Sequence, residues 1–322
     1  MNMVVRSLMR REGVLFIIIA VVGITVGIAN PSFLSAANIS DLFVKSAPFM
    51  IMVCGMTLVI VTREIDISVG SLMGFCAALL GIFTSLSRLH LPVAAGVALT
   101  LLAGTLIGAL NGILVTRGRV PSIIVTLGML TVLRGITIFV MGGEWIGELP
   151  PELRTFGTGS FLGVPFSVLT ALAVVACFIF FTRRVIPGRW VYAVGSNPDA
   201  ARLVGLPVSA VKVLAFTVTG FLTALAAVVS VPQLSVIETD VGNGAELFVI
   251  TCAVVGGVKV AGGRGSIVGA ALGVLLMSMI GSVLIFLRLG EMTVYWEKAI
   301  QGACILAAVL FDHIAERRRK GA

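Results

Sequence analysis

Residues 168–215 read VLTALAVVACFIFFTRRVIPGRWVYAVGSNPDAARLVGLPVSAVKVLA, and this stretch decides the fold class. Its first part, 168–181, is almost continuously apolar, as in a membrane-spanning helix, whereas the strands of a membrane barrel alternate apolar and polar residues. Over the whole chain 58% of residues are hydrophobic and 12% are charged, against about 25% charged in soluble domains. The sequence therefore predicts an all-α integral membrane protein.

The second part of the stretch, 182–215, is basic and carries a set of helix-boundary signals. Asn197 suits the N-cap of a helix, Pro198 its first position and Asp199 the positive end of its dipole. The signals predict a helix of about seven residues, roughly 10 Å long, built from Asn197, Pro198, Asp199, Ala200, Ala201, Arg202 and Leu203 and ended by Gly205. Two interpretations are open: a docking element between two spans, or an interfacial loop helix without a partner.

Hydropathy divides the chain into about ten apolar segments, which we expect to form one transmembrane domain over 1–322 with a connecting loop at 183–210. The segments are 14–30, 47–62, 70–86, 92–115, 121–141, 165–182, 211–231, 246–258, 266–286 and 293–311. Segments 47–62 and 246–258 are shorter than the ~20 residues of a straight span. We therefore expect some of the helices to be discontinuous.

The distribution of basic residues predicts the orientation. Ten crossings place both termini on one side, and 17 of the 23 lysines and arginines fall on that side. The opposite side has only Lys45, Arg88, Arg154 and Arg288. The positive-inside rule then makes both termini and the 183–210 loop cytoplasmic. The net charge of +8 follows from this topology, and basic residues scattered between apolar spans do not predict nucleic-acid binding.

The opposite face is mildly acidic, and its longest loop, 142–164, contains Trp145, Pro150 and Pro151. This loop is long enough for a short helix lying on the membrane. An acidic rim with one sizeable loop would suit a soluble partner. The alternative is that acidic residues are merely tolerated on the outside, since they contribute little to orientation.

Two glycine- and charge-containing breaks interrupt the apolar pattern, at 62–71 and at 256–266. Each follows a short apolar segment and resumes with Ser-x-x-Gly, which indicates a weak internal duplication. Irregular backbone at membrane depth requires protein or water around it. One interpretation places the breaks beside a translocation path, with Asp66, Ser68, Gly70, Ser71, Gly262 and Gly263 as path or gate residues. The other makes them cytoplasmic hairpin turns whose charges face water.

Ionisable residues within the apolar pattern are few. Arg134 is the clearest case, and we favour a structural role in which it ties helices together over a role in the path. Glu64 and Asp66 would need a second intramembrane carboxylate to form a coupling-ion site. Glu246 is the one candidate for that carboxylate, and we expect it near the outer interface.

The sequence predicts no catalytic residues, no metal site and no cofactor. The chain has no Walker lysine, no G-x-S-x-G and no H-E-x-x-H sequence. Its five cysteines lie in apolar segments without metal-ligand spacing, and we expect all five to be buried and unpaired. We therefore expect a transport subunit that is not itself an enzyme.

The assembled motifs resemble the permease subunit of bacterial ATP-binding-cassette importers for monosaccharides of the ribose, xylose and rhamnose type. The resemblance covers nearly the whole chain. It rests on GMTLVI at 55–60, IDISVGS at 65–71, GR at 188–189 with GSNPDAAR at 195–202, and GGRGS at 262–266. GEWI at 143–146 and SVL at 282–284 resemble the autoinducer-2 branch most. The chain departs from the usual pattern at Glu64, at 248–251 and at 258–259.

The resemblance implies a role for each surface. The Asn197–Gly205 helix would be the coupling helix that docks on a cytoplasmic ATPase, which would hydrolyse the ATP. The outer loops would receive a periplasmic sugar-binding protein, and a second permease, identical or paralogous, would complete the path in the lipid of the bacterial inner membrane. The alternative is an ion-coupled secondary sugar carrier with its own midplane site.

Overall fold

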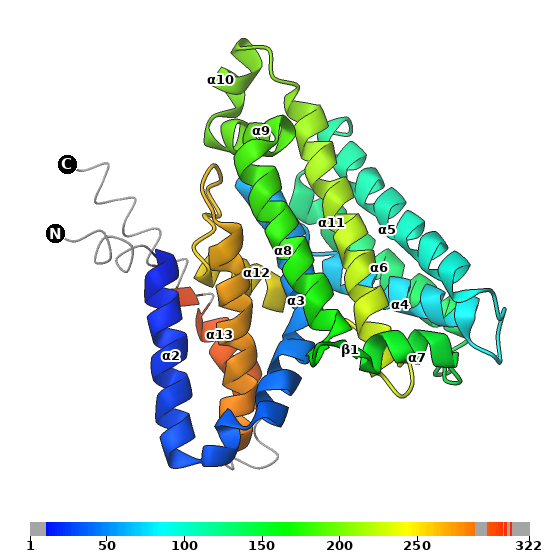
Figure 1. Ribbon diagram of the computed structural model, residues 1–322. Coiled ribbons are helices and arrows are strands. Elements are labelled where there is room, and N and C mark those ends of the chain that lie inside the picture. The colour runs from blue at the N-terminus through cyan, green and yellow to red at the C-terminus, as the bar shows by residue number, and fades with distance from the viewer. Residues whose placement is uncertain (1–10, 287–294, 305, 308–309, 311–322) are drawn as a thin grey trace.

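The computed structural model describes residues 11–286, 295–304, 306–307 and 310. Its elements, in chain order, are α2 (Arg11–Ala29), η1 (Pro31–Leu34), α3 (Ala36–Val61), α4 (Val69–Thr84), α5 (Val93–Thr116), α6 (Ser122–Met141), α7 (Pro151–Thr158), β1 (Ser160–Phe161), β2 (Val164–Pro165), α8 (Phe166–Arg184), α9 (Ile186–Ser196), α10 (Pro198–Leu203), α11 (Val208–Ser230), η2 (Val231–Gln233), α12 (Ala245–Val255) and α13 (Ile267–Phe286). Figure 1 shows them as a bundle of long helices.

Seven described helices are long and apolar enough to cross a membrane: α2, α3, α5, α6, α8, α11 and α13. Two shorter apolar helices, α4 and α12, bring the number that match predicted segments to nine. The tenth segment, 293–311, lies partly outside the described residues, of which 295–304 are helical. The all-α, multi-pass membrane architecture is confirmed. The predicted position of both termini concerns residues outside the described part.

The two predicted short segments turned out differently. α12 has 11 residues and is indeed short. α3 has 26 residues and is not. Its first turns are polar, with an ion pair between Asp41 and Lys45 at 2.8 Å, and hydropathy therefore missed them.

The 142–164 loop does contain a short helix, α7, which is followed by the small antiparallel pair β1–β2.

The centre of the bundle is α3, whose residues from Ser46 to Val61 are nearly all buried. Helices α8, α11, α12 and α13 pack around it, and α5 packs closely on α11. Glycines allow that close approach, because a Cβ built on Gly108 would lie 2.4 Å from the Phe216 carbonyl oxygen. The Gly104, Gly108 and Gly112 steps of the sequence are thus packing positions, as expected of small residues in membrane helices.

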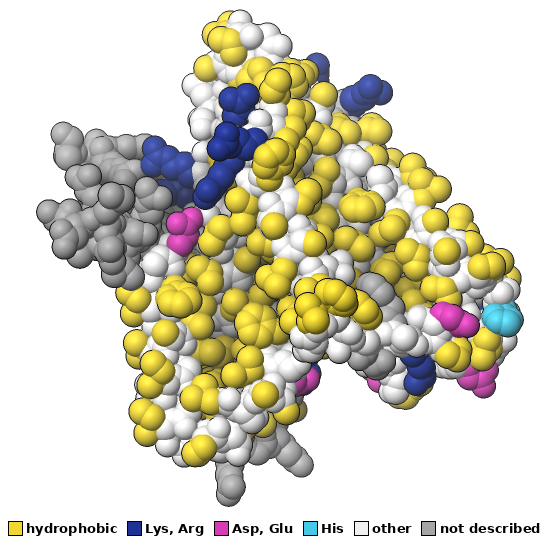
Figure 2. Space-filling model, viewed as in Figure 1, with side chains coloured by type: hydrophobic (Ala, Val, Ile, Leu, Met, Phe, Trp, Pro, Cys, Tyr) yellow, Lys and Arg dark blue, Asp and Glu magenta, His cyan; other side chains and the backbone are white. Residues whose placement is uncertain are grey.

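The bundle has two ends, named here for the elements that lie there. At the α10 end, α3, α5, α8 and α12 finish and α2, α4, α6, α11 and α13 begin; the α7 end is opposite (Figure 1). Most of the basic side chains visible in Figure 2 gather toward the α10 end. The described basic residues of this end are Arg63, Arg117, Arg119, Arg183, Arg184, Arg189, Arg202, Lys212, Lys259 and Arg264.

Candidate functional site

Helix α10 projects from the bundle beyond α9, and its start is built as the sequence predicts (Figure 1). The Asn197 side chain accepts hydrogen bonds from the backbone amides of Asp199 at 3.1 Å and Ala200 at 3.0 Å. Pro198 occupies the first turn. Gly205 follows the helix with a φ of +81°, in the left-handed region that favours glycine. The helix has six residues, close to the expected seven.

The tip of α10 is apolar and faces outward. Leu203 is 88% exposed and Val204, which ends the helix, is 76% exposed. Ala201 is buried on the inner side, and Arg202 pairs with Asp199 at the surface at 3.4 Å. Two large apolar side chains at a polar, projecting end of a membrane protein are typical of a surface that is covered by a partner.

The base of α10 meets both sequence breaks in one place, which we call the break junction: Val61, Arg63, Gly195, Ser196 and Gly263. The Gly263 amide donates to the Val61 carbonyl at 2.9 Å. The guanidinium of Arg63 donates to the carbonyls of Gly195 and Ser196, each at 2.7 Å. The last turn of α9, directly before α10, is therefore bound to the turn between α3 and α4. Its Ser196 hydroxyl also donates to the Gly263 carbonyl, in the turn between α12 and α13, at 3.5 Å.

Glycine is required where the junction is tightest. A Cβ built on Gly195 would lie 1.7 Å from the Val61 carbonyl oxygen and 2.7 Å from the Gly263 nitrogen. Gly262 and Gly263 have φ values of +83° and +71°. Arg63 itself has a φ of +66°, an uncommon conformation for a residue with a side chain. Gly263 is thus part of the junction and Gly262 lies against Arg63 beside it, and the use of both glycines as gate residues stays a prediction.

A buried polar network follows Arg63 in the first break. The Asp66 carboxylate accepts from the Ser68 amide at 2.9 Å and from the Ser68 hydroxyl at 2.6 Å. Asn111 of α5 donates to the same hydroxyl at 2.9 Å, and Ser71 donates to the Ser68 carbonyl at 2.8 Å. The pKa of Asp66 is raised to about 6, because burial raises it by more than the two Ser68 hydrogen bonds lower it. The network fixes the turn that starts α4.

The first break is also fastened to two other helices. The Ile65 amide donates to the Ser122 hydroxyl at the start of α6, at 3.2 Å. Lys212 of α11 forms an ion pair with Glu64, and both side chains are largely buried. Arg63 alone among these residues is exposed. The break is therefore a packed turn in which only the Arg63 charge is exposed. Its packing agrees with the interpretation as a break surrounded by protein, and its exposed charge agrees with the interpretation as a hairpin turn.

Glu246 lies beside the start of α4, and its place relative to the outer interface stays a prediction. Its carboxylate lies against Gly70 in the first turn of α4, where a Cβ would be 1.8 Å from Oε2. Residues 234–244, irregular apart from a bridge between Ile146 and Ile237, bring the chain from the α7 end to this point. The Glu246 Oε2 atom is buried and has no hydrogen-bond partner among the described residues. Sequence reasoning placed this segment by hydropathy, which gives no information on how deep an irregular segment packs.

Arg134 projects from α6 toward the same irregular segment. Its Nη1 atom donates to the Val241 carbonyl at 2.9 Å and lies 3.3 Å from a Cβ built on Gly74 of α4. The guanidinium therefore connects α6 to the 234–244 segment across α4. This contact is the kind that a structural role requires.

At the α7 end the loops are held by a few polar contacts. Ile146 and Ile237 form an antiparallel bridge, Ser85 donates to the Gly147 carbonyl at 2.7 Å, and Arg88 pairs with Glu144 at 3.3 Å. Described acidic residues of this end include Asp41, Glu144, Glu148, Glu152 and Glu238.

Within the described residues, no group of three or more histidine, cysteine, aspartate or glutamate side chains could hold a metal ion. The five cysteines are free. Cys54, Cys76 and Cys252 are buried as expected, but Cys304 is only half-buried and Cys177 is exposed on the apolar outer face of α8. The sequence did not identify Asn111 and Lys212 as partners of the first break. Their only signal in the sequence is a polar side chain within an apolar segment.

Comparison with known proteins gives a consistent family. Residues 38–309 match the family described as branched-chain amino acid transport system / permease component. The chain is 36% identical to the autoinducer 2 import system permease protein LsrC of Escherichia coli (strain K12 / DH10B) over 286 residues, 89% of this chain and 82% of the relative. It is 35% identical to the protein of the same name from Yersinia pestis (strain Pestoides F), over 94% of this chain and 84% of the relative.

No solved structure matches the chain significantly. The family match covers well over half of the sequence, and it agrees with a helical bundle that has seven long apolar helices among its described residues. The chain therefore belongs to the family of permease components of membrane transport systems, and its curated relatives are permeases of autoinducer 2 import systems.

Proposed function

We propose that the chain is the transmembrane permease of an ATP-binding-cassette importer in the bacterial inner membrane. It passes a monosaccharide or sugar-like molecule, of the autoinducer-2, rhamnose or ribose class, from a periplasmic binding protein into the cytoplasm. The family match and the import function named for the relatives support this assignment. ATP hydrolysis belongs to a separate subunit, and a second permease completes the path.

The observation that carries the proposal is the construction of α10. A capped helix projects from the basic end of the bundle and exposes Leu203 and Val204 at its tip. An apolar tip of this kind fits a hydrophobic groove on a soluble partner, as amphipathic helices do in other recognition modes. The excess of basic residues at this end favours a cytoplasmic position. The ATPase would therefore contact α10.

The break junction supports a route for the coupling. A movement of α10 would be transmitted through Ser196 and Gly195 to Arg63 in the first break, and through Val61 to Gly263 in the second. These two breaks begin α4 and α13. Asp66, Ser68, Gly70, Ser71, Gly262 and Gly263 would then shift together when the ATPase binds or releases nucleotide. We propose this as the link between ATP hydrolysis and opening of the path.

The α7 end would receive the loaded binding protein. Its acidic residues and the α7–β1–β2 loop lie opposite α10 (Figure 1). Substrate recognition would rest mainly on the binding protein, as the resemblance to monosaccharide importers implies.

One observation favours the alternative, an ion-coupled carrier. Glu246 has a buried carboxylate oxygen without a partner among the described residues, and intramembrane carboxylates are typical of ion-coupled transport. Glu64 is not available for this role, since it pairs with Lys212. The carrier would thus depend on Asp66 and Glu246.

Leu203→Asp tests the proposal. Burying a leucine stabilises an interface by about 1.5–3 kcal/mol, so its loss should weaken ATPase binding roughly tenfold or more. Leu162→Asp is a matched control, because Leu162 is also 88% exposed but lies at the α7 end. We expect Leu203→Asp to lose co-purification of the ATPase and substrate uptake, and Leu162→Asp to retain co-purification. Equal co-purification by both variants would remove α10 from the interface.

A further inference from the structure

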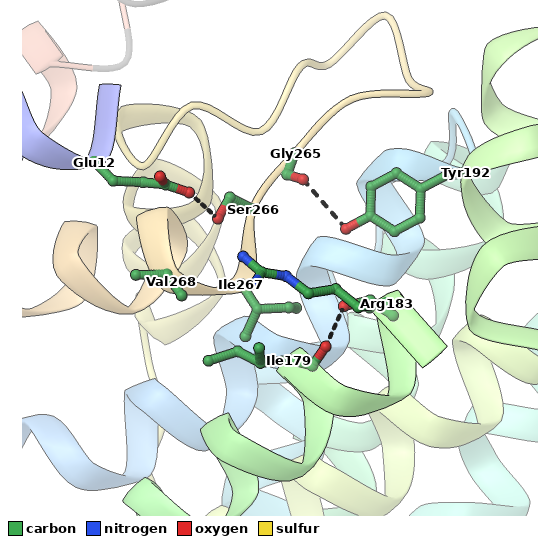
Figure 3. A pocket seen from close by; sticks show the side chains of 9 residues that line it. Glu12, Ile179, Arg183, Tyr192, Gly265, Ser266, Ile267 and Val268 are labelled. Atoms are coloured by element: carbon green, nitrogen blue, oxygen red, sulfur yellow. Dashed lines mark hydrogen bonds between the residues drawn. The ribbon is translucent and has the colours of Figure 1, made fainter. Parts of the chain in front are cut away.

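A cavity of about 350 Å³ lies between helix ends at the α10 end, separate from the break junction. Glu12 from the first turn of α2, Arg183 from the last turn of α8, Tyr192 from α9, and Ser266 and Ile267 at the start of α13 line it (Figure 3). None of these residues takes part in the contacts of α10 described above.

The cavity carries one cation and one anion that are not paired with each other. Figure 3 shows the Arg183 guanidinium extending toward the pair formed by Glu12 and Ser266. Arg183 is exposed and makes no hydrogen bond or ion pair with another described residue. Glu12 accepts from the Ser266 hydroxyl through Oε1 at 2.5 Å, and its Oε2 atom has no donor among the described residues.

Two more features define the chemistry of the cavity. Ser266, Ile267 and Val268, at the start of α13, line the cavity, and helix N-termini favour phosphate groups. Tyr192, whose hydroxyl donates to the Gly265 carbonyl at 3.2 Å, supplies a rigid polar edge. The cavity is therefore suited to a ligand with a phosphate near Arg183 and a cationic hydrogen-bond donor near Glu12.

The position of the cavity indicates the source of such a ligand. It lies where α2 and α13 begin and α8 ends, which is the level of the lipid headgroups for helices that span the membrane. Trp190 and Tyr192 on α9 are residue types of the membrane interface. Along the same helices, Phe16 and Phe180 are each 62% exposed, so acyl chains have an apolar surface to follow.

We propose that this cavity binds the headgroup of phosphatidylethanolamine. The phosphate lies against Arg183 and the start of α13, and the primary ammonium donates to the Glu12 carboxylate. Phosphatidylcholine has a quaternary nitrogen with no N–H to donate, and phosphatidylglycerol has no cation to balance Glu12. The assignment does not depend on the identity of the transported substrate, nor on α10 being the coupling element.

Native mass spectrometry of the full-length chain tests this proposal. The protein is purified in detergent and titrated with phosphatidylethanolamine, phosphatidylcholine or phosphatidylglycerol of the same acyl chains. We expect phosphatidylethanolamine to be retained about tenfold more strongly than either other lipid, the ratio that one charge-assisted hydrogen bond gives. Arg183→Gln and Glu12→Gln should each remove this preference. Arg184→Gln is the control, because the neighbouring Arg184 does not line the cavity.

Three results would overturn the proposal. Stronger retention of phosphatidylglycerol, increased further by Glu12→Gln, would make this an anionic-lipid site. Displacement of the bound lipid by inorganic phosphate would make it a site for a free anion. Equal retention of the three lipids by the wild-type chain, unchanged in Arg183→Gln, would mean that the cavity has no lipid preference.

Discussion

The Gly263 amide donates a 2.9 Å hydrogen bond to the Val61 carbonyl, and so joins the two irregular turns that begin α13 and α4. Arg63 extends this contact to the last turn of α9 through its bonds to Gly195 and Ser196. The two breaks, far apart in the sequence, thus form one junction beneath α10. Changes at α10 should be transmitted to both breaks together.

Gly195→Ala should disrupt this junction. The added Cβ would lie 1.7 Å from the Val61 carbonyl oxygen, and overpacking of this kind costs about 1–3 kcal/mol. We expect a lower midpoint of thermal unfolding in detergent and reduced uptake. Gly128→Ala is the control, since nothing lies within 4 Å of a Cβ at that position of α6. A Gly195→Ala protein as stable and active as Gly128→Ala would show that the junction is not tight.

Replacing Arg63 should separate ATP hydrolysis from transport. Arg63→Gln removes the two 2.7 Å bonds to α9 but leaves an exposed polar side chain, so folding should be nearly unchanged. We expect the ATPase to remain bound while its stimulation by loaded binding protein falls several-fold. Arg119→Gln, another basic residue of the α10 end with a positive φ, serves as the control. Full stimulation in Arg63→Gln would exclude Arg63 from the coupling route.

Replacing Asn197 and Asp199 by alanine should fray α10. The Asn197 side chain accepts two backbone hydrogen bonds, and loss of such a cap costs on the order of 1 kcal/mol. Membrane insertion should be normal, while ATPase association and uptake should be lost. Asn197→Asp preserves a capping oxygen and should retain more association than Asn197→Ala. Unchanged association in the double alanine variant would contradict the docking role.

Arg134→Leu should lower the amount of folded permease. It removes the bond to the Val241 carbonyl, which holds the 234–244 segment against α4 and α6, and leaves that carbonyl without its donor at a cost of about 1–3 kcal/mol. Any remaining uptake should keep its sugar preference. A well-folded variant with altered preference, measured by competition among monosaccharides, would place Arg134 in the path.

Local sequence signals predicted the helix boundaries of α10 closely. Asn197, Pro198 and Gly205 each act on backbone groups within one turn of their own position. Among the described residues, hydropathy found nine apolar helices, since burial in lipid requires continuous apolar residues. It failed at the start of α3, where the first turns are polar, and it gave no information on the packing of Glu246 against Gly70. The break junction could not be predicted, because it depends on contacts between residues far apart in the sequence.

Transport by the purified chain in proteoliposomes tests the central claim most directly. Uptake of autoinducer-2 and a panel of monosaccharides is measured with the chain alone, under a proton or sodium gradient, and with the cytoplasmic ATPase, ATP and a loaded binding protein added. The importer account predicts no gradient-driven uptake by the chain alone and uptake only when all components are present. Gradient-driven uptake by the isolated chain, abolished by Asp66→Asn, would contradict it and favour the ion-coupled carrier.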